Sequence, residues 1–196
     1  MQFMYFIIYK PYGMLCQFTS GENKPVLGDL YPFPKDIYAV GRLDADSEGL
    51  LLLTNDTSLN HLLLNPKFRH ERTYWVQVDG DITSEALANL AKGVTITVDG
   101  KPYQTLPLRT RKMEILPPLP ERIPPIRFRK NIPTSWIELT LHEGKNRQVR
   151  KMTAAVGFPT LRLVRAAIEG IKIEQMQPGE VKQLSKELIY RLLKIK

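Results

Sequence analysis

The sequence predicts an α+β fold, with a mixed, mostly antiparallel central sheet and flanking helices. Short segments rich in β-branched and aromatic residues alternate along the chain with segments of helical periodicity. Four consecutive leucines at 50–53 follow a glycine-containing turn and are typical of a strand buried on both faces. No internal repeat is evident. The 196 residues suit one domain, or two closely packed subdomains, with a sizeable core.

The first third of the chain is predicted to consist of short strands and one helix. Strands are expected at 5–9, 14–18, 37–43 and 50–53, with a single helical turn at 26–31. A helix at 57–64 follows, because the Asp56 carboxylate can accept hydrogen bonds from the backbone N–H groups of a first turn. Asn65 and Pro66 end this helix, since proline cannot continue the helical hydrogen-bond pattern.

The remaining two thirds of the chain alternate in the same way. Strands are expected at 72–79, 94–98, 103–113, 136–141 and 161–168, and helices at 84–92, 146–156 and 185–193. Thr83 or Ser84 is the expected N-cap of the first of these helices, and Gly93 should form a left-handed C-cap. Residues 116–133 hold six prolines and four basic side chains without an apolar period, which predicts an extended, irregular insertion.

Charge and cysteine content narrow the class of protein. Lys and Arg number 28 against 20 Asp and Glu, a formal charge of +8, which favours a polyanion such as nucleic acid as the partner. Cys16 is the only cysteine, so an intramolecular disulfide and a multi-cysteine metal site are excluded, and a reducing cytoplasm is the expected compartment. The apolar start is too short for a signal peptide, and no segment approaches the ~20 apolar residues of a membrane span. The three histidines are far apart and give no metal-ligand spacing.

An acidic loop at 41–49 places Asp44, Asp46 and Glu48 between two apolar segments. A loop between two core strands is held rigidly, and such a mount can aim a carboxylate with the accuracy that catalysis needs. The acidic loop is therefore predicted to hold a catalytic carboxylate. Taken alone, Asp44 could equally be a turn residue, and the other two acidic residues could be solvated or capping groups.

Four cations gather near the start of the helix predicted at 146–156, namely Lys145, Arg147, Arg150 and Lys151. The helix dipole disfavours cations at a helix N-terminus by about 0.3 to 1 kcal/mol each, so an anion is expected nearby. A phosphate or a carboxylate would serve. The alternative is a solvated basic face that only raises solubility. The opposite face carries the residues expected to face the core, Val149, Met152 and Val156.

Four segments, in order, closely resemble the motifs of the RsuA-like pseudouridine synthases, which isomerise uridines in ribosomal RNA. They are Lys10-Pro11-Tyr12-Gly13, the acidic loop with its leucines at 41–56, the segment at 71–76, and the basic segment at 143–152. The similarity extends from about residue 6 to the C-terminus. It implies the catalytic fold of that family, with an active-site cleft. Many members begin with a small RNA-binding S4 domain, and this chain is expected to be a single catalytic domain without one.

The resemblance implies roles residue by residue. Asp44 matches the catalytic carboxylate, Tyr74 the tyrosine that stacks on the target uracil, and Arg150 the basic residue that pairs with that carboxylate. The residues expected to bind the RNA substrate are Arg42, Lys145, Arg147 and Lys151. The expected enzyme is a monomer without metal or cofactor, which converts a specific uridine of large-subunit (23S) ribosomal RNA to pseudouridine.

The chemistry of these residue types agrees with the implied roles. Moving uracil from an N1 linkage to a C5 linkage requires breaking a glycosidic bond, holding the free base and rejoining it. A carboxylate can act as nucleophile at C1′ or as base at C2′, and both remain open. An aromatic ring can receive a base that has left the RNA stack. Two other classes also stay open: a nucleoside-hydrolysing enzyme, for which a second carboxylate is not evident, and a non-catalytic ribosome-assembly factor.

Overall fold

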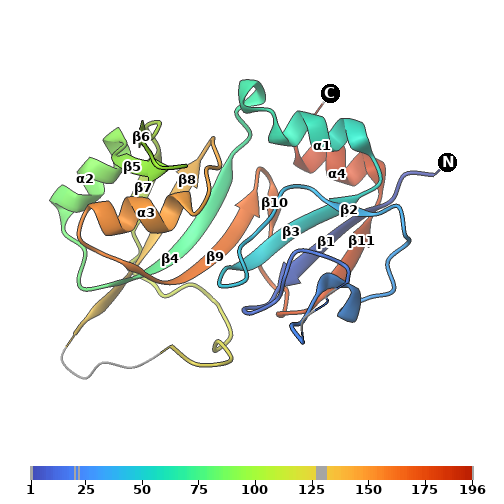
Figure 1. Cartoon of the computed structure of the whole chain (residues 1–196), viewed down its shortest axis with the longest axis horizontal. Coiled ribbons are helices and arrows are strands. Elements are labelled where there is room, and N and C mark those ends of the chain that lie inside the picture. The colour runs from blue at the N-terminus through green and yellow to red at the C-terminus, as the bar shows by residue number, and fades with distance from the viewer. Residues whose placement is uncertain (1, 20, 22, 127–131, 196) are drawn as a thin grey trace. The chain divides into compact units, whose positions relative to one another are not determined.

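The computed structural model describes residues 2–19, 21, 23–126 and 132–195, and these form two compact units (Figure 1). Unit 1 combines Met1–His70 with Val164–Lys196, and unit 2 is Glu71–Leu163. Strands and helices are interleaved in both units, so the predicted α+β class is confirmed. No helix in the described ranges is long and apolar enough to cross a membrane.

Unit 1 is built on a mixed sheet. Its strands are β1 (Tyr5–Lys10), β2 (Tyr38–Ala39), β3 (Glu48–Thr54), β9 (Thr160–Ile168, which enters from unit 2), β10 (Ile171–Lys172) and β11 (Val181–Leu184). The order is β11-β1-β3-β9, with β2 beside β3 and β10 beside β9. All pairs are antiparallel except β3 and β9, which run parallel with Glu48 opposite Val164 and Gly49 opposite Arg165. The helices are η1 (Leu27–Asp29), α1 (Thr57–Leu64), η2 (Pro66–Phe68) and α4 (Lys186–Leu192).

The predicted burial of the leucine strand on both faces is confirmed. Every residue of β3 is buried, and the four leucines at 50–53 have no exposed surface. Leu51 and Leu53 belong to one apolar cluster with Phe6 and Ile8 of β1. Because protein cores are close-packed, β3 cannot shift without opening this cluster. The acidic loop is therefore attached to a strand that is packed into the core on both faces.

Asp56 is the N-cap of α1, as predicted, and it also links three elements of unit 1. Its Oδ1 accepts hydrogen bonds from the backbone N–H groups of Ser58 and Leu59. Its Oδ2 accepts from the hydroxyls of Tyr5 in β1 and Tyr190 in α4, each at 2.8 Å. Burial alone would raise the pKa of Asp56, but hydrogen bonds from the Ser58 hydroxyl, the two tyrosine hydroxyls and the Leu59 N–H more than offset it and lower the pKa to about 2.

Unit 2 is built on an antiparallel sheet and a separate hairpin. The sheet has the order β4-β8-β7, formed by β4 (Arg72–Asp79), β8 (Thr134–Leu141) and β7 (Arg109–Lys112). The hairpin pairs β5 (Thr95–Val98) with β6 (Lys101–Gln104). The helices are α2 (Ser84–Lys92) and α3 (Gln148–Ala155), and in Figure 1 α3 lies against β5. One cluster joins the sheet to both helices through Val76, Leu139, Leu90 and Met152.

Several predicted strands are shorter than expected, for reasons that lie in tertiary contacts. Residues 14–18 form no strand: Leu15 makes a single bridge to Val26, and the backbone hydrogen bonds here run from the Leu15 N–H to Pro25 and from the Leu27 N–H to Gln17. The strand predicted at 37–43 is reduced to β2, because Gly41 turns the chain with a φ of 71°. The strand predicted at 103–113 is broken into β6 and β7. Pro107 has no N–H to donate there, and Leu108 donates to Ala91 of α2 instead.

One further expectation, at the end of α2, is wrong. Gly93 ends α2 with φ 89° and ψ 150°, which is not the left-handed helical conformation. A side chain at Gly93 would overlap the carbonyl oxygen of Thr105, so close backbone packing sets this conformation. Two short strands, β10 and β11, follow the long strand β9 and were not predicted, because both are too short for a clear alternation. The described residues of the insertion at 116–133 form no helix and no strand, and β8 begins directly after the insertion at Thr134.

The Asp56 network gives an expected pH dependence of stability. The folded-state pKa of about 2 lies below the ordinary value of 3.8, so the stabilisation is fully present above about pH 4. It is lost as the pH falls toward 2, and the loss is about 2 kcal/mol. Urea unfolding of the wild type and Asp56→Asn between pH 5 and pH 2 measures it. The difference in unfolding free energy between the two proteins should shrink over this range, and a constant difference would contradict the role of the ionised carboxylate.

Candidate active site

The acidic loop joins β2 to β3 within unit 1. Asp44 and Asp46 are half-buried in it, whereas Glu48 is buried. The backbone N–H of Ser47 donates to the carbonyl of Asp44 at 3.0 Å, which closes a tight turn. Gly49 ends the loop with a φ of 106°, and a side chain there would overlap the backbone of Arg165 in β9. The loop is therefore fixed where it enters the sheet.

The residues on both sides of Asp44 are bonded to one neighbouring segment. The backbone N–H of Gly13 donates to the carbonyl of Ala45 at 2.7 Å. The Cys16 thiol donates to the carbonyl of Leu43 at 3.2 Å and accepts from its N–H at 3.3 Å. Asp44 is thus held between two anchor points, which supports the rigid mount inferred from the sequence.

Lys10 fixes the segment at 11–16, which contains Gly13 and Cys16. Its ammonium is fully buried and donates to the carbonyls of Pro11 at 2.9 Å and Met14 at 2.7 Å. Burial lowers the pKa of Lys10 to about 8, although Cys16 and the three carboxylates of the acidic loop act in the opposite direction. Lys10 therefore interacts electrostatically with all three carboxylates, and its charge offsets part of theirs.

Arg165 is a second buried cation at the base of the acidic loop. The strand registers place Lys10, Gly49 and Arg165 in one row across β1, β3 and β9. Arg165 is 4% exposed, and its Nε donates to the carbonyl of Leu50 at 2.7 Å. Its Nη2 makes no hydrogen bond within the described part of the chain. Sequence reasoning missed Lys10 and Arg165 as part of the site; the available signal was a cation inside an otherwise apolar strand.

Tyr74 lies in unit 2, in the middle of β4. It pairs with Leu139 of β8, is half-buried and packs against the apolar cluster of this unit. β4 is paired with β8 along its whole length, which gives the ring a fixed position. This agrees with a stacking platform and equally with an ordinary sheet tyrosine.

The basic helix starts later than predicted. α3 begins at Gln148, and Arg147 is its N-cap with a φ of 52°, so Lys145 and Arg147 precede the helix. The buried Gln148 explains this start, since its side chain donates to Glu143 at 2.6 Å and accepts from the N–H of Lys145 at 2.9 Å. The predicted core-facing residues Val149 and Met152 are buried, which confirms that face.

The four cations of this segment differ in exposure. Lys145 and Arg147 are exposed, whereas Arg150 and Lys151 are half-buried in the first turn of α3. Arg150 Nη1 donates to the carbonyl of Thr160 at 3.4 Å. The Lys145 ammonium lies 4.8 Å from the ring centroid of Tyr103. These contacts restrict the positions of the Arg150 and Lys145 side chains.

Glu143 holds the basic segment to the hairpin of unit 2. It accepts hydrogen bonds from the Tyr103 hydroxyl at 2.6 Å, the Leu106 N–H at 2.9 Å and Gln148. The bond to Glu143 raises the pKa of the Tyr103 hydroxyl, which keeps it as a donor. Of the predicted site residues, Arg42 and Asp44 lie in unit 1, whereas unit 2 contains Tyr74, Lys145, Arg147, Arg150 and Lys151. The pairing of Asp44 with Arg150 stays a prediction.

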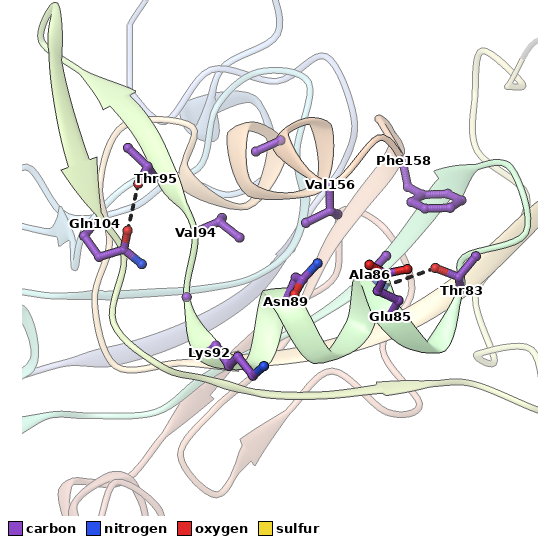
Figure 2. A pocket seen from close by; sticks show the side chains of 12 residues that line it. Thr83, Glu85, Ala86, Asn89, Lys92, Val94, Thr95, Gln104, Val156 and Phe158 are labelled. Carbon is purple, nitrogen blue, oxygen red and sulfur yellow. Dashed lines mark hydrogen bonds between the residues drawn. The ribbon is translucent and has the colours of Figure 1, made fainter.

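Unit 2 also contains a shallow pocket of about 660 Å³ that is separate from the predicted site residues (Figure 2). Its walls come from α2, the β5–β6 hairpin and the end of α3, and Glu85 and Lys92 are its only ionisable lining residues. None of the predicted site residues lines it. Within the described ranges, no group of three His, Cys, Asp or Glu side chains could hold a metal ion.

Comparisons with known proteins point in one direction. A family model described as RNA pseudouridylate synthase matches residues 4–155. The protein named ribosomal large subunit pseudouridine synthase E of Vibrio parahaemolyticus is 49% identical over 178 residues, which cover 91% of this chain and 72% of that protein. Its namesake in Xanthomonas campestris is 47% identical over 179 residues, covering 90% and 93%. A solved structure titled crystal structure of pseudouridylate synthase is 28% identical, with a TM-score of 0.77, and the match covers 97% of this chain and 74% of that one.

The close approach of Gly49 to β9 has a testable consequence for stability. Gly49→Ala should destabilise unit 1 by about 2 to 4 kcal/mol, because the new Cβ overlaps the Arg165 backbone and the positive φ is unfavourable for alanine. Gly144→Ala is the control, since nothing lies within 4 Å of a Cβ there. Urea unfolding compares the two variants, and equal stabilities would contradict the tight junction.

Proposed function

Because the chain belongs to the RNA pseudouridylate synthase family, we propose that it converts a specific uridine of large-subunit (23S) ribosomal RNA to pseudouridine. The choice of RNA is carried by one observation. Relatives that share 47–50% of their residues with about nine tenths of this chain are named ribosomal large subunit pseudouridine synthase E. The anchored Asp44 and the exposed cations of the basic segment support the same chemistry and the same polyanionic substrate.

We propose Asp44 as the carboxylate that acts on the ribose. The N1–C1′ bond breaks, the uracil turns, a C5–C1′ bond forms, and C5 loses a proton while N1 gains one. No electron is transferred overall, so the reaction needs no redox cofactor and no added group. Asp44 serves either as nucleophile at C1′ or as base at C2′. Its bonded neighbours Leu43 and Ala45 support this role, because a fixed backbone limits the positions that the carboxylate can take.

The other predicted site residues keep the roles that the family resemblance implies, and the needs of this reaction agree with those roles. Tyr74 stacks on the uracil after it has left the RNA stack. Arg150 pairs with the Asp44 carboxylate, and its early position in α3 supports a role with an anion, because cations there are otherwise disfavoured. The residues proposed to contact the RNA backbone are Arg42, Lys145, Arg147 and Lys151.

We further propose that the enzyme acts as a cytoplasmic monomer. The single cysteine, Cys16, supports a reducing compartment. All residues proposed to act on the RNA belong to this one chain, which supports a monomer.

The role of Asp44 is tested by release of the C5 hydrogen from unmodified 23S RNA labelled at C5 with tritium. Asp44→Asn should lower the rate by at least about 1,000-fold while RNA binding is retained, because the carboxylate acts on the reacting atoms. Asp46→Asn, a neighbouring carboxylate in the same loop, should change the rate by less than about tenfold. Full activity of Asp44→Asn would show that the carboxylate is wrongly assigned.

The same assay separates the alternative functions. Release of free uracil would indicate a nucleoside-hydrolysing enzyme. Binding of RNA by the wild type without any tritium release would indicate an assembly factor. Either result would replace the proposed isomerisation.

The basic segment is tested by the salt dependence of RNA binding. Lys145→Ala should reduce the slope of log affinity against log salt concentration by about 0.7 to 0.9, which corresponds to one lost phosphate contact. Lys172→Ala is the control, because Lys172 is paired with Glu174 at 3.5 Å in unit 1. Titrations of labelled RNA between 50 and 300 mM KCl, about the range in which such slopes are linear, give both values. An unchanged slope for Lys145→Ala would show that this side chain does not touch the RNA backbone.

A further inference from the structure

An exposed aromatic ring stands between two cations in the turn at residues 66–70, called here the aromatic turn. Phe68 is 48% exposed, and the adjacent Lys67 and Arg69 are exposed as well. Large apolar side chains on a surface are common singly, so exposure alone indicates nothing. Three further observations distinguish this ring from an ordinary surface phenylalanine.

The backbone of the aromatic turn is fixed. Asn65 caps it by accepting a hydrogen bond from the Lys67 N–H at 3.0 Å, and Pro66 restricts the first φ. The N–H groups of Phe68 and Arg69 donate to the carbonyls of Asn65 and Pro66 at 3.2 Å each. A ring presented from such a turn loses little conformational entropy when a ligand stacks on it.

A second ring supports Phe68 from within unit 1. The His70 ring centroid lies 6.4 Å from that of Phe68, with an angle of 38° between the planes. His70 Nδ1 lies 3.2 Å from Oε1 of Glu169, whose side chain is 8% exposed and whose Oε2 is 3.1 Å from the Lys194 ammonium. Phe68 therefore contacts an anchored ring and still keeps about half of its surface exposed.

The aromatic turn begins next to the acidic loop. A Cβ at Gly41 would lie 3.1 Å from Cδ2 of Leu64, the last residue of α1, so α1 ends against the first residue of the loop. Phe68 follows Leu64 by four residues, a span of at most about 14 Å. Arg42, next to Gly41, is also exposed. Phe68, Lys67 and Arg69 thus lie on the unit that carries Asp44, a few residues after the helix end that meets the acidic loop.

We propose that the aromatic turn binds an unpaired nucleotide of the substrate RNA beside the target uridine, with Phe68 stacked on its base and Lys67 on its phosphate. The inference rests on the proposed function. Residues 64–70 contain no carboxylate, and the chain carries a net charge of +8, so the surface is complementary to a polyanion. Exposed aromatic rings flanked by cations are the common means of binding single-stranded nucleic acid, because every base offers a stacking face.

Equilibrium binding and tritium release on naked 23S RNA fragments test this site. Phe68→Ala should weaken binding roughly 5- to 50-fold and raise KM, with kcat at saturating RNA and the salt slope unchanged, because stacking displaces no counterions. Phe68→Trp should retain wild-type affinity. Lys67→Ala should instead reduce the salt slope by about 0.7 to 0.9.

Phe3→Ala is the matched control. Phe3 is 44% exposed, and the Lys186 ammonium lies 5.7 Å from its ring centroid, so it is also an exposed phenylalanine beside a cation. Phe3 lies just before β1, at the end of the β1–β3 pair where Tyr5 is opposite Thr54. The acidic loop joins β3 at the other end of this pair, where Lys10 is opposite Gly49. The binding, KM and kcat of Phe3→Ala should equal those of the wild type.

The outcomes separate this inference from the proposed function. Wild-type affinity and KM in Phe68→Ala, together with an active wild type, would overturn the stacking site alone. A loss seen only with ribosomal particles, and not with naked RNA, would mean that the turn binds protein and would equally overturn it. A wild type that neither binds nor isomerises 23S RNA would instead refute the proposed function.

Discussion

The three carboxylates of the acidic loop, Asp44, Asp46 and Glu48, repel one another, and this repulsion must be offset for the loop to stay fixed on the sheet. In unit 1, buried cations lie next to the loop. Lys10 and Arg165 lie on the strands that flank Gly49, one on each side. Burying a charge is unfavourable unless hydrogen bonds replace the lost water. Lys10 is satisfied by two carbonyl groups, and Arg165 Nε by a third. Arg165 Nη2 is buried and has no hydrogen-bond acceptor among the described residues.

This constraint explains why the neighbouring elements have their form. The turn after β1 brings Gly13 and Cys16 to the residues on either side of Asp44, and Lys10 holds that turn closed. Asp56 performs a similar task at the other end of β3, where it links β1, α1 and α4. β3 is therefore fixed at both ends by buried ionised groups and along its length by the leucines. A loop attached to such a strand can present one carboxylate in a constant position.

Sequence reasoning succeeded where local residues decide the structure. The helix at 57–64 and the strand at 72–79 were predicted with their observed ends, because Asp56, Asn65 and Pro66 determine the helix ends and alternation determines the strand. It failed where distant contacts decide. The start of α3 depends on Gln148 reaching Glu143, which is itself held by Tyr103, and the break between β6 and β7 depends on Leu108 bonding to α2. The acidic loop and the basic segment were identified from their motifs, but the buried cations beneath the loop could be assigned only from strand register.

Formation of a pseudouridine in large-subunit ribosomal RNA by the proposed carboxylate, Asp44, is tested most directly in cells. Pseudouridines are mapped along 23S RNA in a strain lacking the gene, and again after complementation with the wild type or with Asp44→Ala. The loss of one pseudouridine, restored by the wild type and not by the variant, is the expected result. An unchanged pseudouridine map in the deletion strain, or full restoration by Asp44→Ala, would contradict the proposal.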